Sequence, residues 1–231
     1  MTLALFEDPL PPRAARSLAP GAVLLQGFCR DLGAALLQAV ADVAAQAPWR
    51  HLITPGGYRM SVAMTNCGPL GWTSDRTGYR YAPNDPASAL PWPAMPAAFA
   101  ALAASAAQAA GFGHFAPDAC LINRYLPGTK LSLHQDRDEQ ELAHPIVSVS
   151  LGIPAMFLFG GLARADRCER IPVAHGDVLV WGGPARLRYH GVLPLKEAAH
   201  PLSGRCRINL TFRKAGASHG AQVTGRAPPH P

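Results

Sequence analysis

The pattern that decides the fold begins with Leu131-Ser132-Leu133-His134-Gln135-Asp136-Arg137-Asp138. The two-residue period of a β-strand puts both leucines on one face, and it puts His134, Asp136 and Asp138 on the other. An imidazole and a carboxylate two positions apart on one face can bind a metal ion from adjacent corners. A third ligand from elsewhere, for which His190 is the candidate, would complete the two-histidine, one-carboxylate triad that holds non-haem Fe(II).

A second His-x-Asp occurs at His175-Gly176-Asp177. Glycine directly before the apolar run 178–181 is typical of a turn that leads into a strand, so strand alternation does not place these two side chains. Short motifs have low specificity, and a solvated turn would explain either copy. We therefore rank His134 and Asp136 above His175 and Asp177 as metal ligands.

Beyond this stretch the chain continues as a series of short strands. Apolar segments recur from Ala119 onward, separated by Gly, Pro or Asp. The predicted strands cover residues 119–126, 131–136, 146–151, 156–159, 178–181, 187–192 and 207–213. Short strands at this spacing favour a sandwich or jelly roll. We therefore expect a mainly β fold with flanking helices.

The N-terminal half is predicted to contain two helices. A short strand around residues 23–25 comes first. Asp31 is then a candidate N-cap for a helix over residues 32–46. A second predicted helix over residues 93–110 opens with a proline and stops at Gly111. Both helices are expected to flank the sheets.

The length of 231 residues suits one hydrophobic core, since barrels and sandwiches of this size are commonly single domains. We expect a single domain over residues 21–216, with an N-terminal extension over 21–118 and a jelly-roll core over 119–216. Residues 1–20, rich in Pro, Ala and Arg, are predicted to form an irregular lead-in. Residues 217–231 are predicted to be a disordered tail.

Charge and cysteine content bear on partners and compartment. The net charge of +6 favours a polyanionic partner, although a modest excess of arginine is also found on ordinary surfaces. The 5 cysteines are scattered without a C-x-x-C, which indicates reduced thiols. The N-terminus lacks a basic segment before an apolar run, and no window is apolar enough to span a membrane. We expect a cytoplasmic monomer with no membrane association.

Residues 51–92 combine tyrosines and tryptophans with arginines in a glycine-rich segment. Bases stack on aromatic rings and phosphates pair with guanidinium groups, so this composition is typical of a nucleic-acid surface. An equally simple explanation is that the aromatic rings anchor a loop to the core. The residues alone leave both open.

A second pattern lies at residues 207–213. Ile208, Leu210 and Phe212 alternate with four polar residues, of which Arg207 and Arg213 are the outermost. One explanation is a sandwich strand with one face in the core and the other in solvent. The alternative is a polar barrel interior, in which the two arginines bind the ends of a short dicarboxylate. Neighbouring hydrogen bonds would come from Asn123 and Tyr125.

With these residues in place, the sequence resembles the bacterial members of the AlkB-type alkylated-DNA dioxygenases. The motifs that carry the resemblance are T-P-G-G-Y-x-M-S-V-A-M-T-N-C-G at 54–68, L-I-N-R-Y at 121–125, L-S-L-H-Q-D-R-D-E at 131–139, V-S-V-S-L-G at 147–152, H-G-D-V-L-V-W-G-G at 175–183, Y-H-G at 189–191 and R-x-N-L-T-F-R at 207–213. They cover nearly everything from about residue 21 to 216. The two ends of the chain match nothing in the family.

The resemblance implies a double-stranded β-helix (jelly-roll) core with an N-terminal nucleotide-recognition lid, and it assigns roles to residues. The iron ligands would be His134, Asp136 and His190. The 2-oxoglutarate site would contain Asn123, Arg124, Tyr125, Arg207, Asn209 and Arg213. The contacts to the substrate nucleotide would be Trp72, Tyr79, Arg80, Tyr81, Asp138 and Arg164. His175 and Asp177 would fall in a structural turn.

The resemblance also implies the reaction. With Fe(II), 2-oxoglutarate and O2, the enzyme would hydroxylate the alkyl group of 1-methyladenine or 3-methylcytosine in DNA, and also in RNA, and would release formaldehyde, succinate and CO2. One rival is an oxygenase with the same cofactors and another target, such as RNA alone, a protein or a metabolite. A second rival is a cupin-like metal-binding module without redox activity, which leaves the polar row at 207–213 unexplained.

Overall fold

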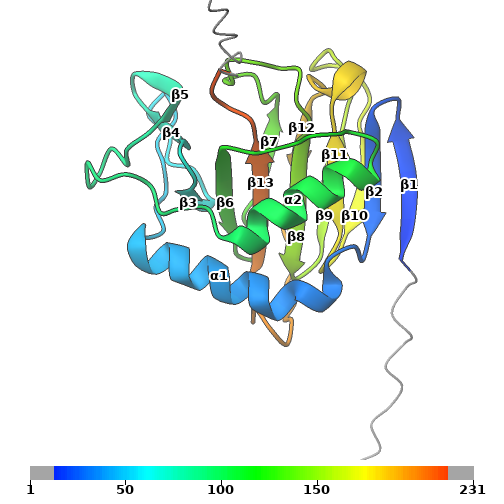
Figure 1. The fold of residues 1–231 in the computed structure, drawn as a ribbon, viewed down its shortest axis with the longest axis horizontal. Coiled ribbons are helices and arrows are strands. Elements are labelled where there is room, and N and C mark those ends of the chain that lie inside the picture. The colour runs from blue at the N-terminus through cyan, green and yellow to red at the C-terminus, as the bar shows by residue number, and fades with distance from the viewer. Residues whose placement is uncertain (1–12, 218–231) are drawn as a thin grey trace, which may run out of the picture.

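The structure is a computed structural model that describes residues 13–217. Its centre is two antiparallel β-sheets packed face to face, with two helices on the outer face of the larger sheet (Figure 1). The larger sheet has the order β1 (Ala14–Ala19), β2 (Ala22–Gln26), β11 (Val178–Trp181), β8 (Ile146–Gly152), β13 (Arg207–Arg213), β6 (Ala119–Tyr125) and β3 (Ala63–Cys67). The smaller sheet has the order β10 (Glu169–Val173), β9 (Ala155–Phe159), β12 (His190–Val192) and β7 (Leu131–His134).

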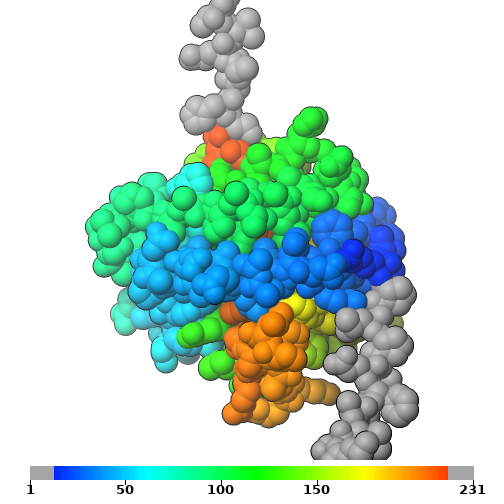
Figure 2. Space-filling model, turned by 60° about the horizontal axis from the view of Figure 1, so that its bottom comes forward, coloured from blue at the N-terminus to red at the C-terminus, as the bar shows by residue number. Residues whose placement is uncertain are grey.

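The remaining elements lie around this sandwich. Helices α1 (Gly33–Gln46) and α2 (Ala97–Ala109) cross the outer face of the larger sheet next to each other, as Figures 1 and 2 both show. Strands β4 (Gly71–Asp75) and β5 (Gly78–Ala82) form a separate hairpin beside β3. The predicted jelly-roll class is therefore confirmed. None of the helices in the described range 13–217 is long and apolar enough to span a membrane.

Two hydrophobic cores hold the layers together. One lies between the helices and the larger sheet, and it contains Leu36 and Val40 of α1 and Phe99 of α2. The other lies between the two sheets, and it contains Phe157 of β9 and Trp181 of β11. Alternating side chains in the central strands of the larger sheet therefore serve two different interiors, since strands such as β8 and β13 are covered on both faces.

Strand β13 shows what this double coverage means for the site. Ile208, Leu210 and Phe212 point into the core beneath the helices. The polar residues between them are buried as well, because all seven residues of β13 are buried. Of the two explanations left open by the sequence, the polar interior is therefore correct: this face of the strand lies between the sheets and away from bulk solvent.

Several predicted boundaries were wrong. Residues 14–19 of the predicted irregular lead-in form the edge strand β1; residues 1–12 and 218–231 lie outside the described part of the chain. Asp31 does not cap α1, whose N-cap is Leu32, because Asp31 instead pairs with Arg13. Helix α2 begins at Ala97 rather than at residue 93, since Pro96 disfavours helical geometry in the residue before it.

The larger sheet draws strands from both halves of the chain. Strands β1, β2 and β3 come from before residue 119, and the other four come from after it. The predicted strand over 187–192 is shorter, beginning at His190, because a 3-10 turn over Gly183–Ala185 precedes it. The predicted extension and core thus share one sheet, which places the β4–β5 hairpin directly beside the sandwich interior.

Candidate active site

Two of the predicted metal ligands are direct cross-strand neighbours in the smaller sheet. His134 at the end of β7 pairs in register with His190 at the start of β12. Their ring centroids are 4.3 Å apart. Because the sheet ladder fixes both backbones, the two imidazoles meet without help from a loop.

A β-bulge in this strand pair corrects one detail of the prediction. His190 and Val192, two residues apart, pair with His134 and Leu131, which are three residues apart. The extra residue on β7 is the signature of a bulge. Leu131 therefore packs against the core between the sheets together with the His134 face, rather than on the opposite face as strict alternation predicted.

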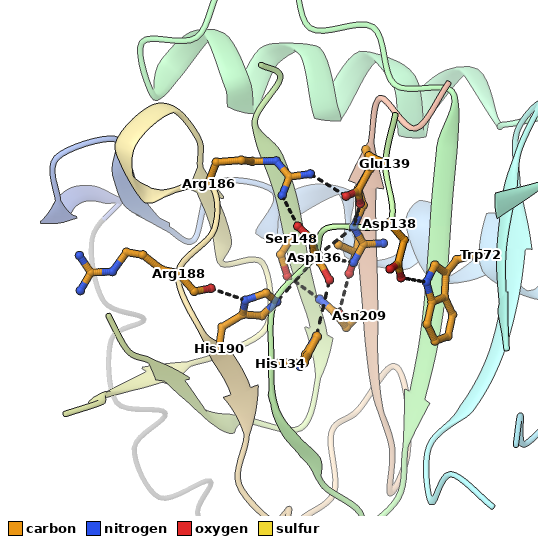
Figure 3. A network of polar contacts seen from close by, with 12 residues as sticks. Trp72, His134, Asp136, Asp138, Glu139, Ser148, Arg186, Arg188, His190 and Asn209 are labelled. Carbon is orange, nitrogen blue, oxygen red and sulfur yellow. Dashed lines mark hydrogen bonds and ion pairs between the residues drawn. The ribbon is translucent and has the colours of Figure 1, made fainter. Parts of the chain in front are cut away.

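Asp136 completes the cluster from the loop that follows β7. Its Oδ1 lies 3.6 Å from His134 Nε2, and its Oδ2 lies 3.7 Å from His190 Nε2. The three potential ligand atoms all lie within 4.8 Å of one another, as Figure 3 shows for the three side chains. The structure thus brings together the three residues that the sequence singled out, although strand β7 ends at His134 and does not itself carry Asp136.

The hydrogen bonds of the two histidines leave the inward nitrogens free for a metal. His134 Nδ1 lies 2.9 Å from the Ser132 carbonyl, and His190 Nδ1 lies 3.1 Å from the Arg188 carbonyl. A carbonyl only accepts, so each Nδ1 carries a proton, and in the neutral form of the ring it is Nε2 that presents a lone pair. This is the tautomer that a metal-binding histidine requires.

The electrostatics also suit a cation. Burial alone would raise the pKa of Asp136, but the Arg213 guanidinium and the two histidines hold it well below its usual range. Burial and the neighbouring His134 lower the pKa of His190 to about 3. At neutral pH the cluster therefore presents the carboxylate of Asp136 and the neutral imidazole of His190, which fits the facial triad of a non-haem Fe(II) site.

Next to the triad, a cavity of about 670 Å³ opens between the two sheets. Its wall includes the polar face of β13, where Asn209 Nδ2 donates to Ser148 Oγ at 2.8 Å and Arg207 Nη2 donates to Ser150 Oγ at 2.9 Å. Several buried polar atoms in this wall have no hydrogen-bond partner within the described residues. They are Asn123 Oδ1, Tyr125 Oη, Arg207 Nε and Nη1, and Arg213 Nη1.

Unpaired buried donors of this kind need a ligand, because an unsatisfied buried polar group is costly. Arg207 is 2% exposed, and the structure shows no acidic side chain paired with it within residues 13–217. The oxygens of an anionic molecule would accept from the donors in this set, those of Tyr125, Arg207 and Arg213, and 2-oxoglutarate fits that description. Arg213 offers less than expected, since it already pairs with Asp136 at 2.5 Å and with Glu139 at 3.3 Å.

The prediction for Arg124 is wrong. Its neighbours Asn123 and Tyr125 line the cavity, and alternation turns Arg124 to the other face of β6. There its guanidinium carbon lies 4.8 Å from the ring centroid of Trp49. Arg124 therefore packs on the helix side of the sheet, away from the cavity.

Four of the six predicted nucleotide contacts line the cavity, namely Trp72, Tyr79, Asp138 and Arg164. The rings of Trp72 and Tyr79 are stacked, with centroids 5.5 Å apart and planes 16° apart. Arg164 lies over the ring of Tyr189 on another part of the cavity wall. Two aromatic residues of the 51–92 segment, Trp72 and Tyr79, therefore reach the same cavity as the His–Asp–His triad.

The other two predicted contacts lie outside the cavity wall. Arg80 is turned away from Tyr79 by strand alternation, and it pairs with Asp75 at 2.6 Å within the hairpin. The Tyr81 hydroxyl donates to Glu139 Oε1 at 2.9 Å. Neither residue has the direct cavity position that the resemblance implied.

Sequence reasoning gave no role to a buried ion pair behind the triad. Glu139 and Arg186 are 3.0 Å apart, with side chains 1% and 4% exposed. Arg186 also donates to the Asp136 carbonyl at 2.7 Å, so it holds the loop that carries Asp136 (Figure 3). Glu139 stands at the end of the motif at 131–139, but nothing in the local pattern marks Arg186, which reaches the site only through the fold.

The second His-x-Asp forms a structural turn. Asp177 accepts hydrogen bonds from the backbone N–H groups of Gly27 and Ala174, at 2.7 and 2.8 Å. His175 Nδ1 accepts from the Gly152 N–H at 3.0 Å. Gly176 has a φ of +87°, which favours glycine. Within residues 13–217, the triad is the cluster whose geometry suits a metal, and this turn is not part of it.

These features define a class of protein. A jelly-roll interior with a His–Asp–His triad beside unpaired cationic donors is the site of a non-haem Fe(II) oxygenase that uses an anionic co-substrate. Comparisons with known proteins agree. The model of the 2OG-Fe(II) oxygenase superfamily matches residues 21–213. AlkB of Escherichia coli (strain K12), an alpha-ketoglutarate-dependent dioxygenase, is 58% identical over 93% of this chain and 98% of its own length.

Two further similarities support the assignment. The structure of OsALKBH1 superposes with a TM-score of 0.78 at 29% identity, over 87% of this chain and 100% of that one. The tRNA demethylase abh1 of Schizosaccharomyces pombe is 32% identical over 46% of this chain and 39% of its own length. The chain therefore belongs to the 2OG-Fe(II) oxygenase superfamily, and within it to the AlkB-type alpha-ketoglutarate-dependent dioxygenases. Fe(II), 2-oxoglutarate and O2 are its cofactor and co-substrates.

Proposed function

We propose that this dioxygenase removes alkyl groups from nucleic-acid bases, with 1-methyladenine and 3-methylcytosine in DNA as its main substrates and alkylated RNA as a further one. The observation that supports the proposal is the shared cavity. The metal triad lies in the same cavity as the stacked rings of Trp72 and Tyr79 and the carboxylate of Asp138. A planar cationic base that enters this cavity meets aromatic faces, a negative charge and the metal.

Different residues of the site would bind the metal and the co-substrate. His134, Asp136 and His190 would hold Fe(II). The unpaired donors of Arg207 and its neighbours would bind 2-oxoglutarate. When bound, iron and co-substrate supply the oxidising chemistry that converts the N-methyl group and O2 to an N-hydroxymethyl group, while 2-oxoglutarate becomes succinate and CO2. The hydroxymethyl product then breaks its C–N bond and gives formaldehyde and the restored base.

The chain must also deliver the base and select it. A base inside a duplex cannot reach the cavity, so it is flipped out or comes from a single strand, and a lesion that blocks pairing lowers that cost. Trp72 and Tyr79 provide surfaces for stacking. Asp138 favours 1-methyladenine and 3-methylcytosine over normal bases, because these lesions are cations.

The direct test is mass spectrometry of a methylated oligonucleotide incubated with the protein, Fe(II), 2-oxoglutarate and O2. We expect a loss of 14 Da per lesion, the mass of one CH2, together with equimolar succinate. Succinate without demethylation would point to an oxygenase with another target. Membership of the superfamily decides against the rival in which the metal site has no redox role.

Binding to nucleic acid should depend on salt. The net charge of +6 predicts that phosphate contacts contribute to affinity, and each contact releases counterions. We expect the logarithm of the association constant for a methylated single strand to fall linearly with log[salt]. The slope should be about −0.7 per phosphate contact. An affinity that does not change with salt would instead favour a small-molecule or protein substrate.

A further inference from the structure

The carboxylate of Asp138 already holds one hydrogen bond in the free protein. The indole Nε1 of Trp72 donates to Asp138 Oδ2 at 2.9 Å (Figure 3). Both side chains line the cavity, and Asp138 lies two residues after the metal carboxylate Asp136. The hydrogen bond therefore joins the aromatic wall of the cavity to the loop that carries the acidic group.

Trp72 is itself fixed to the larger sheet. Its backbone N–H donates to Asn66 Oδ1 at 3.0 Å, and its carbonyl accepts from Asn66 Nδ2 at 3.0 Å. Asn66 is 2% exposed and lies in β3, where it pairs in register with Leu121 of β6. Tyr79 covers one face of the indole. The position of the indole N–H is thus set by a buried strand and not by the exposed hairpin alone.

Asp138, by contrast, has little else to hold it. Its side chain is exposed, and no other hydrogen bond reaches its carboxylate from the described part of the chain. A short exposed side chain samples several rotamers, and one directed hydrogen bond selects among them. With Oδ2 occupied by the indole, Oδ1 remains free to face a ligand in the cavity.

We propose that the Trp72 indole N–H, held in place by Asn66, is a specificity-determining positioning group that directs Oδ1 of Asp138 toward a cationic base. This inference rests on the proposed function and deepens it. It gives Trp72 two separable tasks, because the ring can stack on a base whether or not its N–H is present. The hydrogen bond should therefore control the preference for cationic over neutral lesions, and the ring should control the binding of both.

The test uses two lesions that differ in the group at ring carbon 4, an amino group in one and a carbonyl in the other, and as a result in charge. Oligonucleotides of one sequence carry either 3-methylcytosine, a cation, or 3-methyluracil, which is neutral and has its methyl group on the same ring nitrogen. Trp72→Phe keeps an aromatic ring and removes the N–H. We expect the ratio of kcat/KM for the cationic lesion to that for the neutral lesion to fall about tenfold, the value of one charge-assisted hydrogen bond.

Trp92→Phe is the matched control. Trp92 lies in the same N-terminal extension, and its indole Nε1 donates to the Ala82 carbonyl at 3.0 Å at the end of β5. The control removes the same kind of N–H from a tryptophan that does not contact Asp138. We expect Trp92→Phe to change kcat/KM for both lesions by the same factor and to leave their ratio unaltered.

Asn66 provides a second, independent variant. Asn66→Ala removes both hydrogen bonds that hold the Trp72 backbone, so the ratio should fall as in Trp72→Phe. In the double variant Asn66→Ala/Trp72→Phe, the ratio should fall no further than in Trp72→Phe alone, because both changes act through one hydrogen bond. Additive losses would show that Asn66 acts by another route and would overturn its part in the proposal.

Binding of the same two oligonucleotides to the protein without Fe(II), read by fluorescence anisotropy, does not depend on turnover. The wild type should prefer the cationic strand, and Trp72→Phe should lose most of that preference. If Trp72→Phe keeps the wild-type ratio in both assays, the positioning role is wrong. If the wild type demethylates neither lesion yet shows the binding preference that Trp72→Phe lacks, the proposed reaction is wrong and the positioning role stands.

Discussion

Asp136 makes contacts through both its carboxylate and its backbone carbonyl. Its two oxygens approach His134 Nε2 and His190 Nε2, and Arg213 donates to its Oδ2 through Nε and Nη2. Arg186 holds its backbone carbonyl. The residue is therefore fixed through both its side chain and its main chain, so that its position is set before a metal binds.

At this scale, loss of one ligand should end turnover. His134→Ala or Asp136→Ala is expected to abolish succinate release, because two remaining ligands do not hold Fe(II) in a facial site. His175→Ala is the control. It removes a hydrogen bond from the Gly152 N–H and should lower stability by about 1–2 kcal/mol while turnover persists. A well-folded but inactive His175→Ala protein would contradict our ranking of the two motifs.

For Arg207 we expect that substitution of a buried residue does not lower the thermal stability of the protein. Its guanidinium is buried with two nitrogens unpaired, so Arg207→Met should leave the thermal stability of the ligand-free protein unchanged or raise it. The same change should abolish the rise in Tm that 2-oxoglutarate causes with Mn(II) present, measured by scanning fluorimetry. Arg124→Met, on the other face of the sheet, should keep that rise. Loss of the ligand effect in both variants would refute the assignment.

At the scale of elements, the alternation of polar and apolar residues in β13 could be predicted from the sequence. Whether its polar face lies in solvent or in the interior could not. The pattern at residues 207–213 matched the observed strand, yet only packing by the second sheet made its polar face an interior. Strand β10 was missed because Pro172 argues against a strand, and it is tolerated here because β10 lies at a sheet edge. The bulge in β7 was missed because a one-residue insertion is invisible to a periodic pattern.

One ion pair joins the segment between the β4–β5 hairpin and α2 to the residues before β3. Arg50 pairs with Asp85, which is 3% exposed. Burial alone would raise the pKa of Asp85, but the hydrogen bonds from Arg50 and from the Ala87 N–H lower it below its ordinary value. A carboxylate whose pKa is lower in the folded state stabilises the protein at pH values above its unfolded-state pKa of about 3.9. This stabilisation is lost as the pH falls through the folded-state pKa.

Asp85→Asn should therefore destabilise the protein by roughly 3 kcal/mol at pH 7. The difference in unfolding free energy between this variant and the wild type should shrink as the pH is lowered toward 3, because the wild-type carboxylate becomes protonated. Urea unfolding at a series of pH values measures both quantities. A difference that stays constant from pH 7 to pH 3 would show that the ion pair is not its source.

At the scale of the molecule, metal binding should be visible as stability. The two histidines proposed as ligands lie in the smaller sheet, and Asp136 is tied to the larger one through Arg213 of β13, so one ion would link both layers. At a hundredfold excess over Kd, Mn(II) should add about 2.7 kcal/mol to the unfolding free energy. Asp136→Ala should lose the effect, and EDTA should reverse it. A Tm that is unchanged by Mn(II) would contradict the site.

The two-layer architecture and the pair of His134 with Asp136 could be anticipated from the sequence, because strand periodicity and motif spacing are local. Contacts such as Arg186 with Glu139 or Trp72 with Asp138 could not, since they join segments 47 and 66 residues apart through the fold. The oligomeric state stays a prediction: light scattering should give a mass of 24.4 kDa for a monomer.

The cross-strand pairing of His134 with His190 also bears on how the site responds to toxic metal ions. Because strand pairing already holds the two histidines next to each other, the site does not exclude a foreign ion by keeping them apart. Cobalt and nickel bind nitrogen and oxygen ligands more tightly than ferrous iron does. Cells loaded with either element should therefore accumulate unrepaired lesions while the enzyme itself stays folded and abundant.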